Sequence, residues 1–406
     1  MKIRKQIRFL YLYEIVSGLQ IVDLVWVLLL LQRGFSLAEA GIAEGVFHLI
    51  SMCCEIPSGM AADLMGRKKT MVLAGMISAL SSVCMIATDF FPMILLSMGL
   101  NALSYNLVSG SREALTYDSL KEAGMEQQYL RIASRQEMIY QILCAVTGLI
   151  SVLTVRMGFR AAYLLAAVQG MACAGIAARL WEAGERKTEE WRKSVFRTIC
   201  CEVIRHFQIS FRFLREHPSI RCRMAAGGGM GAVGYLISML LQEYLVTLGL
   251  SEDLVGIPLF FLSLSGVAGA FLSERTGKRT CGTVVLAGGL TAAAAAAFCG
   301  SGSLFAVVAA ASGVQCMDEM ICLRLENENQ KETDSEIRAT VVSVGSMVYS
   351  IWMAVLSPVC GYAARILSVP AAFAGLGGLM AGLAVWYAVC GNRAERKLHP
   401  ESGENQ

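Results

Sequence analysis

The feature that most constrains this chain is a series of twelve apolar segments, each about as long as a helix that crosses a bilayer. They lie at residues 9–32, 41–62, 70–88, 92–111, 136–155, 161–180, 223–249, 254–273, 281–299, 303–323, 339–364 and 370–391. With 55% hydrophobic and 17% charged residues, the composition is that of a membrane protein. We therefore predict an all-α membrane protein with twelve transmembrane helices.

The distribution of basic residues supports this count. If the N-terminus is cytoplasmic, the cytoplasmic segments hold 31 of the 35 lysines and arginines, and the outer loops hold Arg33, Arg156, Arg160 and Arg365. Cytoplasmic loops of membrane proteins carry such an excess. The basic start of the chain runs into an apolar stretch without a small-residue cleavage site, which indicates a retained first helix. We expect a multi-pass protein of the cytoplasmic (plasma) membrane with both termini inside.

A distinctive motif begins inside the second apolar segment and continues beyond its end. Gly59, Asp63 and Gly66 lead into Arg67, Lys68 and Lys69, in the pattern Gly-x-x-x-Asp-x-x-Gly-Arg-Lys-Lys. This pattern resembles the loop signature between helices 2 and 3 of the major facilitator superfamily of transporters. The preceding Glu55-Ile-Pro-Ser-Gly59 is similar to a marker of a bacterial subgroup. The resemblance implies two pseudo-symmetric six-helix bundles around a cavity, and secondary transport by alternating access.

An internal repeat is consistent with two halves. A shift of 211 residues places Asp63 on Glu274 and Gly66 on Gly277, with basic residues following in both copies. Two such halves match the parallel repeats of the facilitator fold. We predict an N-terminal bundle at 1–180, a cytoplasmic linker at 181–222 and a C-terminal bundle at 223–406.

The linker has its own pattern. Apolar residues recur there every three or four positions, with arginines and lysines among them: Trp191, Val195, Ile199, Val203, Phe207, Phe211 and Leu214. This predicts a basic amphipathic helix on the inner membrane face. A clamp that joins the halves is favoured over a regulatory site.

Ionisable residues within spans are costly and usually face a cavity or a partner. Asp23, with Gln20 one turn before it, is near the middle of the first segment, and we expect it to be the main proton-coupling group. The alternative is a protonated carboxyl that bonds to a neighbouring helix. Glu14 lies about half a turn away around the helix and close to the inner interface, so it is interpreted as structural.

The second segment carries one polar stripe: Glu44, His48, Ser51, Glu55 and Gly59. The stripe predicts either a packing seam of small and polar residues or a proton path through His48. For Glu44 and His48 the two interpretations are equally favoured. For Glu55 a structural role is favoured, in which it anchors the signature loop.

Two positions suggest gating. In the resembling family an arginine near this part of helix 4 belongs to a proton-relay motif, and Arg112 is the candidate. It lies at the cytoplasmic end of its segment, so pairing with Asp63 is equally expected. Glu274, the counterpart of Asp63, is the second gating candidate, and Asp63 itself is expected to act as a conformational latch.

Polar and aromatic residues within other spans are candidates for the substrate cavity: Gln20, Asn101, Tyr105, Tyr235, Ser238, Gln242, Glu243 and Gln315. Asp318 and Glu319 lie near the expected cytoplasmic end of their segment. A role in an inner gate and a role in substrate contact are equally expected for them.

Several functions are disfavoured. The 14 cysteines and 4 histidines show no metal-ligand spacing, and Gly229–Gly234 matches a dinucleotide fingerprint only within an apolar span. We expect no enzyme activity, cofactor, metal or nucleic-acid partner, and a monomer. Residues 145–150 lack the proline and paired glycines of drug antiporters in the resembling family. Proton-coupled efflux of a small molecule is the expected function, and the alternatives are an uptake permease or uniporter, or a non-transport membrane protein on the same scaffold.

Overall fold

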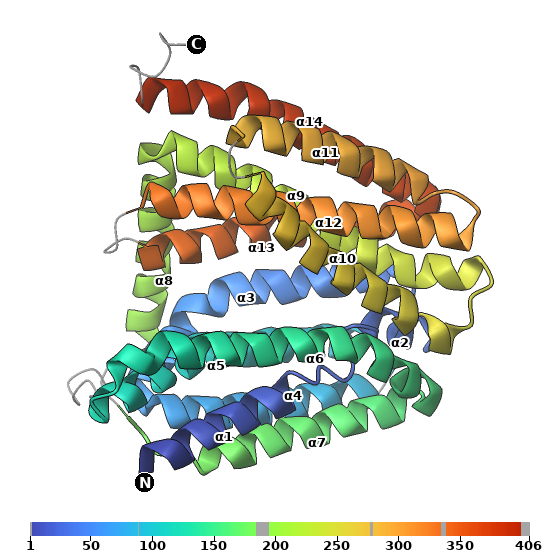
Figure 1. The fold of residues 1–406 in the computed structure, drawn as a ribbon. Helices are drawn as coiled ribbons and strands as arrows, with labels where there is room; N and C mark the ends of the chain where they lie inside the picture. Colours follow the sequence, from blue (N-terminus) through green and yellow to red (C-terminus); the bar gives the residue numbers. More distant parts are fainter. Residues whose placement is uncertain (1, 88, 184–194, 277–278, 334–337, 399–406) are drawn as a thin grey trace. The chain divides into compact units, whose positions relative to one another are not determined.

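The computed structural model describes residues 2–87, 89–183, 195–276, 279–333 and 338–398. Within these ranges all regular secondary structure is helical, which agrees with the predicted class (Figure 1). The helices are α1 Lys2–Ser17, α2 Trp26–Leu31, α3 Leu37–Met65, α4 Arg67–Ala87, α5 Phe91–Glu122, α6 Tyr129–Met157, α7 Phe159–Ala178, α8 Val195–Glu216, α9 Pro218–Thr247, α10 Gly256–Arg275, α11 Cys281–Phe298, α12 Leu304–Lys331, α13 Arg338–Ile366 and α14 Val369–Leu398.

Ten helices of the described chain are long and apolar enough to cross a membrane, and α6, bent by 43°, makes an eleventh if its two parts form one span. Each overlaps one of the apolar segments. The remaining segment is the first, where no single helix is long enough. The count of twelve therefore stays a prediction.

The first apolar segment is broken, and the expectation of one continuous helix over 9–32 is wrong. The chain leaves the helix after Ser17 and re-enters it at Trp26, and Gln20 adopts a φ of +36°. The carbonyls that the break frees are satisfied by side chains. Gln169 Nε2 donates to the carbonyl oxygen of Val16 at 2.6 Å, and Thr147 Oγ1 donates to that of Leu19 at 3.0 Å. In a membrane an unsatisfied carbonyl would be expensive, so α6 and α7 make the break tolerable.

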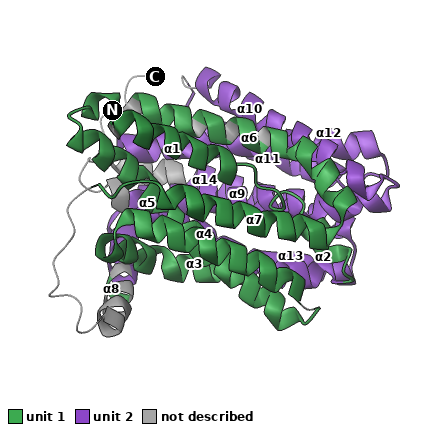
Figure 2. Ribbon diagram, turned by 90° about the horizontal axis from the view of Figure 1, so that it is seen from below, with its two compact units in different colours: residues 1–34, 46–206 green, residues 35–45, 207–406 purple. Residues whose placement is uncertain are grey.

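The chain divides by internal contacts into two compact units, coloured separately in Figure 2. Unit 1 comprises residues 1–34 and 46–206, and unit 2 comprises residues 35–45 and 207–406. The first turns of α3 belong to unit 2 because they pack tightly on α13. A Cβ on Gly45 would lie 3.0 Å from Pro358 Cγ, and one on Gly361 would lie 3.1 Å from the Cα of Ala38. The expected boundaries at 181 and 222 stay a prediction.

Each unit has its own packing centre. In unit 1, α4 packs between α5 and α7, and a Cβ on Gly75 would lie 2.7 Å from the carbonyl oxygen of Gly170. In unit 2, α9 is surrounded by α12, α13 and α14. Glycines along α9 permit this, since a Cβ on Gly229 would lie 2.7 Å from Leu383 Cδ1. Small residues let helix backbones approach closely within a bilayer.

The linker forms the predicted helix in part. α8 begins at Val195, and the expected members Trp191, Arg192 and Lys193 lie outside the described residues. In unit 2, α8 crosses the ends of α9, α12 and α13 (Figure 1). There Phe213 packs against Ile220 and Val344. The position of α8 on a membrane surface stays a prediction.

The orientation can be tested by thiol labelling. We expect a single cysteine at position 365 in a cysteine-free background to react with an impermeant thiol reagent applied from outside, because this exposed arginine is placed in an outer loop. Position 33 is also predicted outside, but the Arg33 side chain is 1% exposed and pairs with Asp89, so a cysteine there should react more slowly. Cysteines at positions 121, 197 and 331 should react only after the membrane is opened. Labelling of position 197 from outside would overturn the topology.

Candidate functional site

The signature motif forms a turn of a single residue. α3 continues to Met65 and α4 begins at Arg67, so Gly66 alone lies outside a helix, with a φ of +92°. Gly59 and Asp63 lie in the last two turns of α3, so this helix ends later than the predicted end of the second segment at residue 62. The Asp63 side chain is exposed, and its role as a latch stays a proposal.

Contacts within unit 1 hold this turn in place. Lys68 donates its backbone N–H to Glu182 Oε1 at 3.4 Å, so the carboxylate lies at the positive N-terminus of α4. A Cβ on Gly66 would lie 2.6 Å from Glu182 Oε2. Arg67 pairs with Asp118 and donates to the carbonyl oxygen of Ala114 at 2.8 Å. The sequence analysis missed Glu182 and Asp118, although the three consecutive cations of the motif already require acidic partners.

This geometry predicts opposite effects at the two glycines of the motif. Gly66→Ala should destabilise the protein by about 1–3 kcal/mol, because alanine disfavours a positive φ and its Cβ would collide with Glu182. Gly59→Ala should be neutral or stabilising by about 0.5–1 kcal/mol, since no atom lies within 4 Å of its Cβ position and the backbone is helical. Thermal unfolding of the two variants in detergent compares them. Equal unfolding midpoints for the two variants would contradict the view that only Gly66 is required by the backbone conformation.

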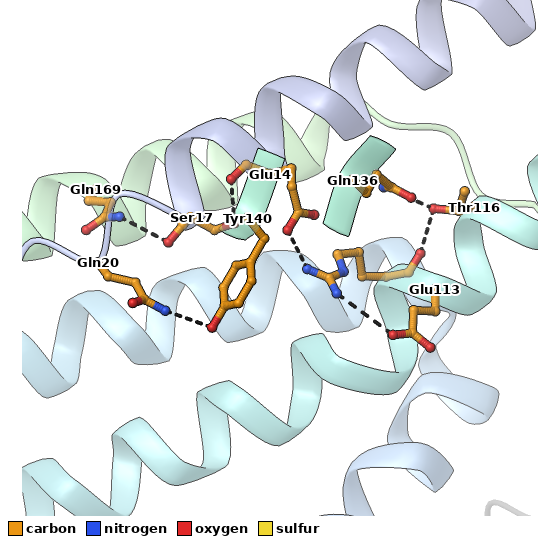
Figure 3. Close-up of polar contacts among 9 residues, drawn as sticks. Glu14, Ser17, Gln20, Glu113, Thr116, Gln136, Tyr140 and Gln169 are labelled. Atoms are coloured by element: carbon orange, nitrogen blue, oxygen red, sulfur yellow. Dashed lines mark hydrogen bonds and ion pairs between the residues drawn. The ribbon is translucent and has the colours of Figure 1, made fainter. Parts of the chain in front are cut away.

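A buried ion pair links α1 to α5 (Figure 3). Arg112 Nη1 lies 2.7 Å from Glu14 Oε1, and its Nη2 lies 3.8 Å from Glu113 Oε1. The side chain of Glu14 is 1% exposed and that of Arg112 is 22% exposed. The expected pairing of Arg112 with Asp63 is thus replaced by a pairing with Glu14. Both residues lie near the ends of their apolar segments that are predicted to be cytoplasmic, and this shared predicted depth could have indicated the pair.

A second polar group surrounds the break after α1 (Figure 3). Gln20 Nε2 donates to the hydroxyl of Tyr140 at 3.0 Å, and Cys144 Sγ donates to Gln20 Oε1 at 3.6 Å. The predicted cavity residue Gln20 is therefore held at both ends of its amide by α6. Asp23 lies in the break itself rather than within a continuous helix, and the rest of the chain leaves its side chain exposed. Its coupling role stays a proposal.

The stripe on α3 is partly buried. The side chains of Glu44 and His48 are buried, and Glu55 is half-buried. Ser51 Oγ donates to Asn106 Oδ1 of α5 at 3.0 Å. The contact at Ser51 is of the kind expected for a packing seam, and no observation tests the proton path through His48.

On α12 of unit 2 the carboxylate of Asp318 is buried, with 7% of the residue exposed. Cys322, one turn later, donates its thiol to Asp318 Oδ1 at 3.6 Å and lies 3.8 Å from the carbonyl oxygen of Gly227 on α9. A Cβ on Gly234 of α9 would lie 3.0 Å from Asp318 Cγ. The glycines of α9 thus create the space that Asp318 occupies. Glu319, its neighbour, is half-buried towards α10.

The remaining predicted residues are distributed over several helices. Gln242 is buried, Ser238, Gln315 and Asn101 are half-buried, and Tyr235 and Tyr105 are exposed. Glu243 is half-buried, and its buried Oε2 has no hydrogen-bond partner in the described chain. Glu274 is exposed near the end of α10, while Gly277 and Lys278 lie outside the described residues. No observation tests their roles.

Unit 2 contains a counterpart to the ion pair of unit 1. Arg223 on α9 is fully buried, with its Nη1 3.0 Å from Glu332 Oε1 and its Nε 2.7 Å from Asn329 Oδ1. An Arg–Glu pair with one buried member thus links α1 to α5 in unit 1 and α9 to the C-terminal end of α12 in unit 2, with the charges exchanged between the helices. The sequence analysis missed this pair, although an arginine at the edge of the seventh apolar segment was visible.

Within the described residues, no group of three or more His, Cys, Asp or Glu side chains is arranged to hold a metal ion. The polar groups are carboxylates, guanidiniums, amides and hydroxyls within helices. Such a set can bind a polar solute and exchange protons.

Comparisons with known proteins place this geometry in a family. The Major Facilitator Superfamily matches residues 12–318. No curated protein matches the chain. Among solved structures, the nucleoside transporter NupG is similar with a TM-score of 0.75 and 14% identity, over 96% of this chain and 99% of that one. A peptide transporter POT in complex with sulfate is similar with a TM-score of 0.74 and 14% identity, over 97% and 95% of the two chains.

A POT family transporter in complex with 5-aminolevulinic acid gives a TM-score of 0.74 at 12% identity, over 96% of each chain. At such identities the similarity shows the fold and not the substrate. The family match covers most of the chain and agrees with the signature turn and the two helical units. The chain is a transporter rather than an enzyme, and it belongs to the major facilitator superfamily.

Proposed function

We propose that this protein moves a small polar molecule across the cytoplasmic membrane by alternating access, with proton coupling and in the outward direction. The observation that carries the proposal is the environment of Asp318. It is a carboxylate within a membrane-spanning helix, enclosed by α9 and α12. A carboxylate inside a span is seldom retained unless it has a functional or structural task.

The contacts of Asp318 favour a functional task. Within the described chain its carboxylate accepts a hydrogen bond from the thiol of Cys322, which is a weak donor. Among the described residues no lysine or arginine forms an ion pair with it, in contrast to Glu14 and Glu332. A charge there would lack compensation, so the carboxyl is suited to binding a proton in one state and releasing it in another. Glu14 is less suited, because Arg112 compensates its charge.

Other residues take supporting parts in this proposal. Asp23, Glu44 and His48 are proposed to pass protons through the N-terminal half of the chain, and Gln20 with Tyr140 is proposed to contact the solute. The efflux direction rests on the resemblance of Glu55-Ile-Pro-Ser-Gly59 to a bacterial subgroup. The solutes of the structural neighbours do not define the solute of this chain.

The test is flux in proteoliposomes. Candidate solutes are first selected by their effect on the thermal stability of the purified protein, and the binders are then loaded into vesicles with an imposed pH gradient. We expect export of a bound solute in exchange for protons. Accumulation in the direction of the protons would show an uptake permease, and flux that ignores the gradient would show a uniporter. Binding without any flux would support a non-transport protein on this scaffold.

A further inference from the structure

The helix α8 presents a surface that the rest of the described chain does not cover. Phe213 and Ser210 face inward and are buried, and Phe213 packs on Ile220 at the start of α9. On the other side Arg212 and Arg215 are exposed, and Phe211 is 71% exposed. The exposed phenylalanine beside the packed face leaves apolar surface available for a further contact.

The order of side chains around α8 is that of a helix at a membrane surface. At 100° per residue, Phe211 lies at one border between the packed and polar faces, and Ile209 lies at the other. Both are exposed, although they flank the buried face. The arc between them carries Arg212 and Arg215. Apolar borders beside a basic face are typical of helices that lie in the plane of the lipid headgroups.

The charge on this arc is positive. Arg205, Arg212 and Arg215 lie on it together with a single carboxylate, that of Glu216. Neither Arg212 nor Arg215 forms an ion pair with any residue that the structure describes. A guanidinium offers a planar pair of donors that matches a phosphate group. In unit 2, α8 lies at the ends of α9 and α13 (Figure 1), where Phe213 packs with Ile220 and Val341.

We infer that the exposed surface of α8, formed by Ile209, Phe211, Arg212 and Arg215, binds anionic phospholipids of the inner leaflet. The two arginines contact the phosphates, and Phe211 and Ile209 enter the boundary between headgroups and acyl chains. Lipid is the occupant because a basic arc between two apolar borders is the pattern of a helix in the headgroup region, where phosphates supply the counter-charge. A neutral or purely apolar partner would leave the arginines without a counter-charge.

The first test uses vesicles of phosphatidylcholine with or without phosphatidylglycerol. After extraction, native mass spectrometry counts the lipids that stay bound to the full-length protein. We expect phosphatidylglycerol to be preferred, and Arg212→Gln and Arg215→Gln each to lower the preference about fivefold, which corresponds to about 1 kcal/mol per arginine near an anionic surface. The matched control removes two exposed arginines elsewhere, with Arg160→Gln and Arg365→Gln. Equal loss in the control would overturn the inference.

The second test reports on position 211 directly. A Phe211→Trp variant, measured as the difference from the parent protein with its 5 tryptophans, should be quenched by phospholipids spin-labelled near the top of the acyl chain. Quenching by aqueous iodide alone would place this surface in the cytoplasm and overturn the inference. Protection from both quenchers would indicate coverage by protein, such as a second copy, and would overturn it as well.

Discussion

In proteoliposomes, Asp318→Asn should reduce pH-gradient-driven flux to the level of protein-free vesicles while exchange of solute for solute continues. Asparagine has nearly the shape of aspartate, so it fits the space that Gly234 leaves in α9. Asparagine cannot bind or release a proton, so the variant resembles the permanently protonated carrier. Such a carrier could still exchange solute for solute, but it could not couple that movement to a proton gradient. Separate measurement of driven flux and of exchange is decisive, because a misfolded variant would lose both.

Glu319→Gln is the matched control for this variant. It is the adjacent carboxylate on α12 but is only half-buried. We expect it to retain most of the driven flux. If Asp318→Asn transports at the native rate, Asp318 is not the coupling group, and Asp23, Glu44, His48 and Glu243 become the candidates. If both variants lose driven flux to the same extent, the loss reflects a general disturbance of α12 and contradicts a specific role for Asp318.

The second large effect is expected at the ion pair of Glu14 and Arg112. Glu14→Gln should destabilise the protein by about 3–5 kcal/mol, because removal of one partner of a buried pair leaves the other charge uncompensated. The arginine is 22% exposed, so water relieves part of this cost and the lower end of the range is expected. Unfolding of the purified protein by added denaturing detergent measures the loss.

A double variant distinguishes this explanation from lost packing. Glu14→Gln combined with Arg112→Gln removes both charges, and it should be more stable than Glu14→Gln alone, because a neutral amide pair carries no uncompensated charge. Purely additive losses would show that the two side chains contribute independently. The pair at Arg223 and Glu332 offers the same cycle in unit 2, where Glu332 is 31% exposed.

The all-helical membrane architecture could be read from the sequence because it depends on local quantities. Eleven of the twelve apolar segments each lie largely on one observed helix, from α3 to α14 with α8 excepted, and the first is divided between α1 and α2. A bilayer demands long apolar helices whatever their neighbours are, so length and hydropathy alone are informative. The signature of Gly66 and Arg67 was likewise visible, and it led to the family that the comparison then showed.

The details of the site depended on partners far away in the chain. The break at Gln20 exists because Thr147 and Gln169 supply hydrogen bonds that replace helical ones, and no local pattern reveals that. Arg112 pairs with Glu14, 98 residues away in the chain, instead of with Asp63. The packing of α5 against α1 determines this pairing. The sequence by itself thus determined which segments enter the membrane, because that is a property of each segment. Only the tertiary structure decided which polar groups meet, because their partners come from helices whose packing no single segment encodes.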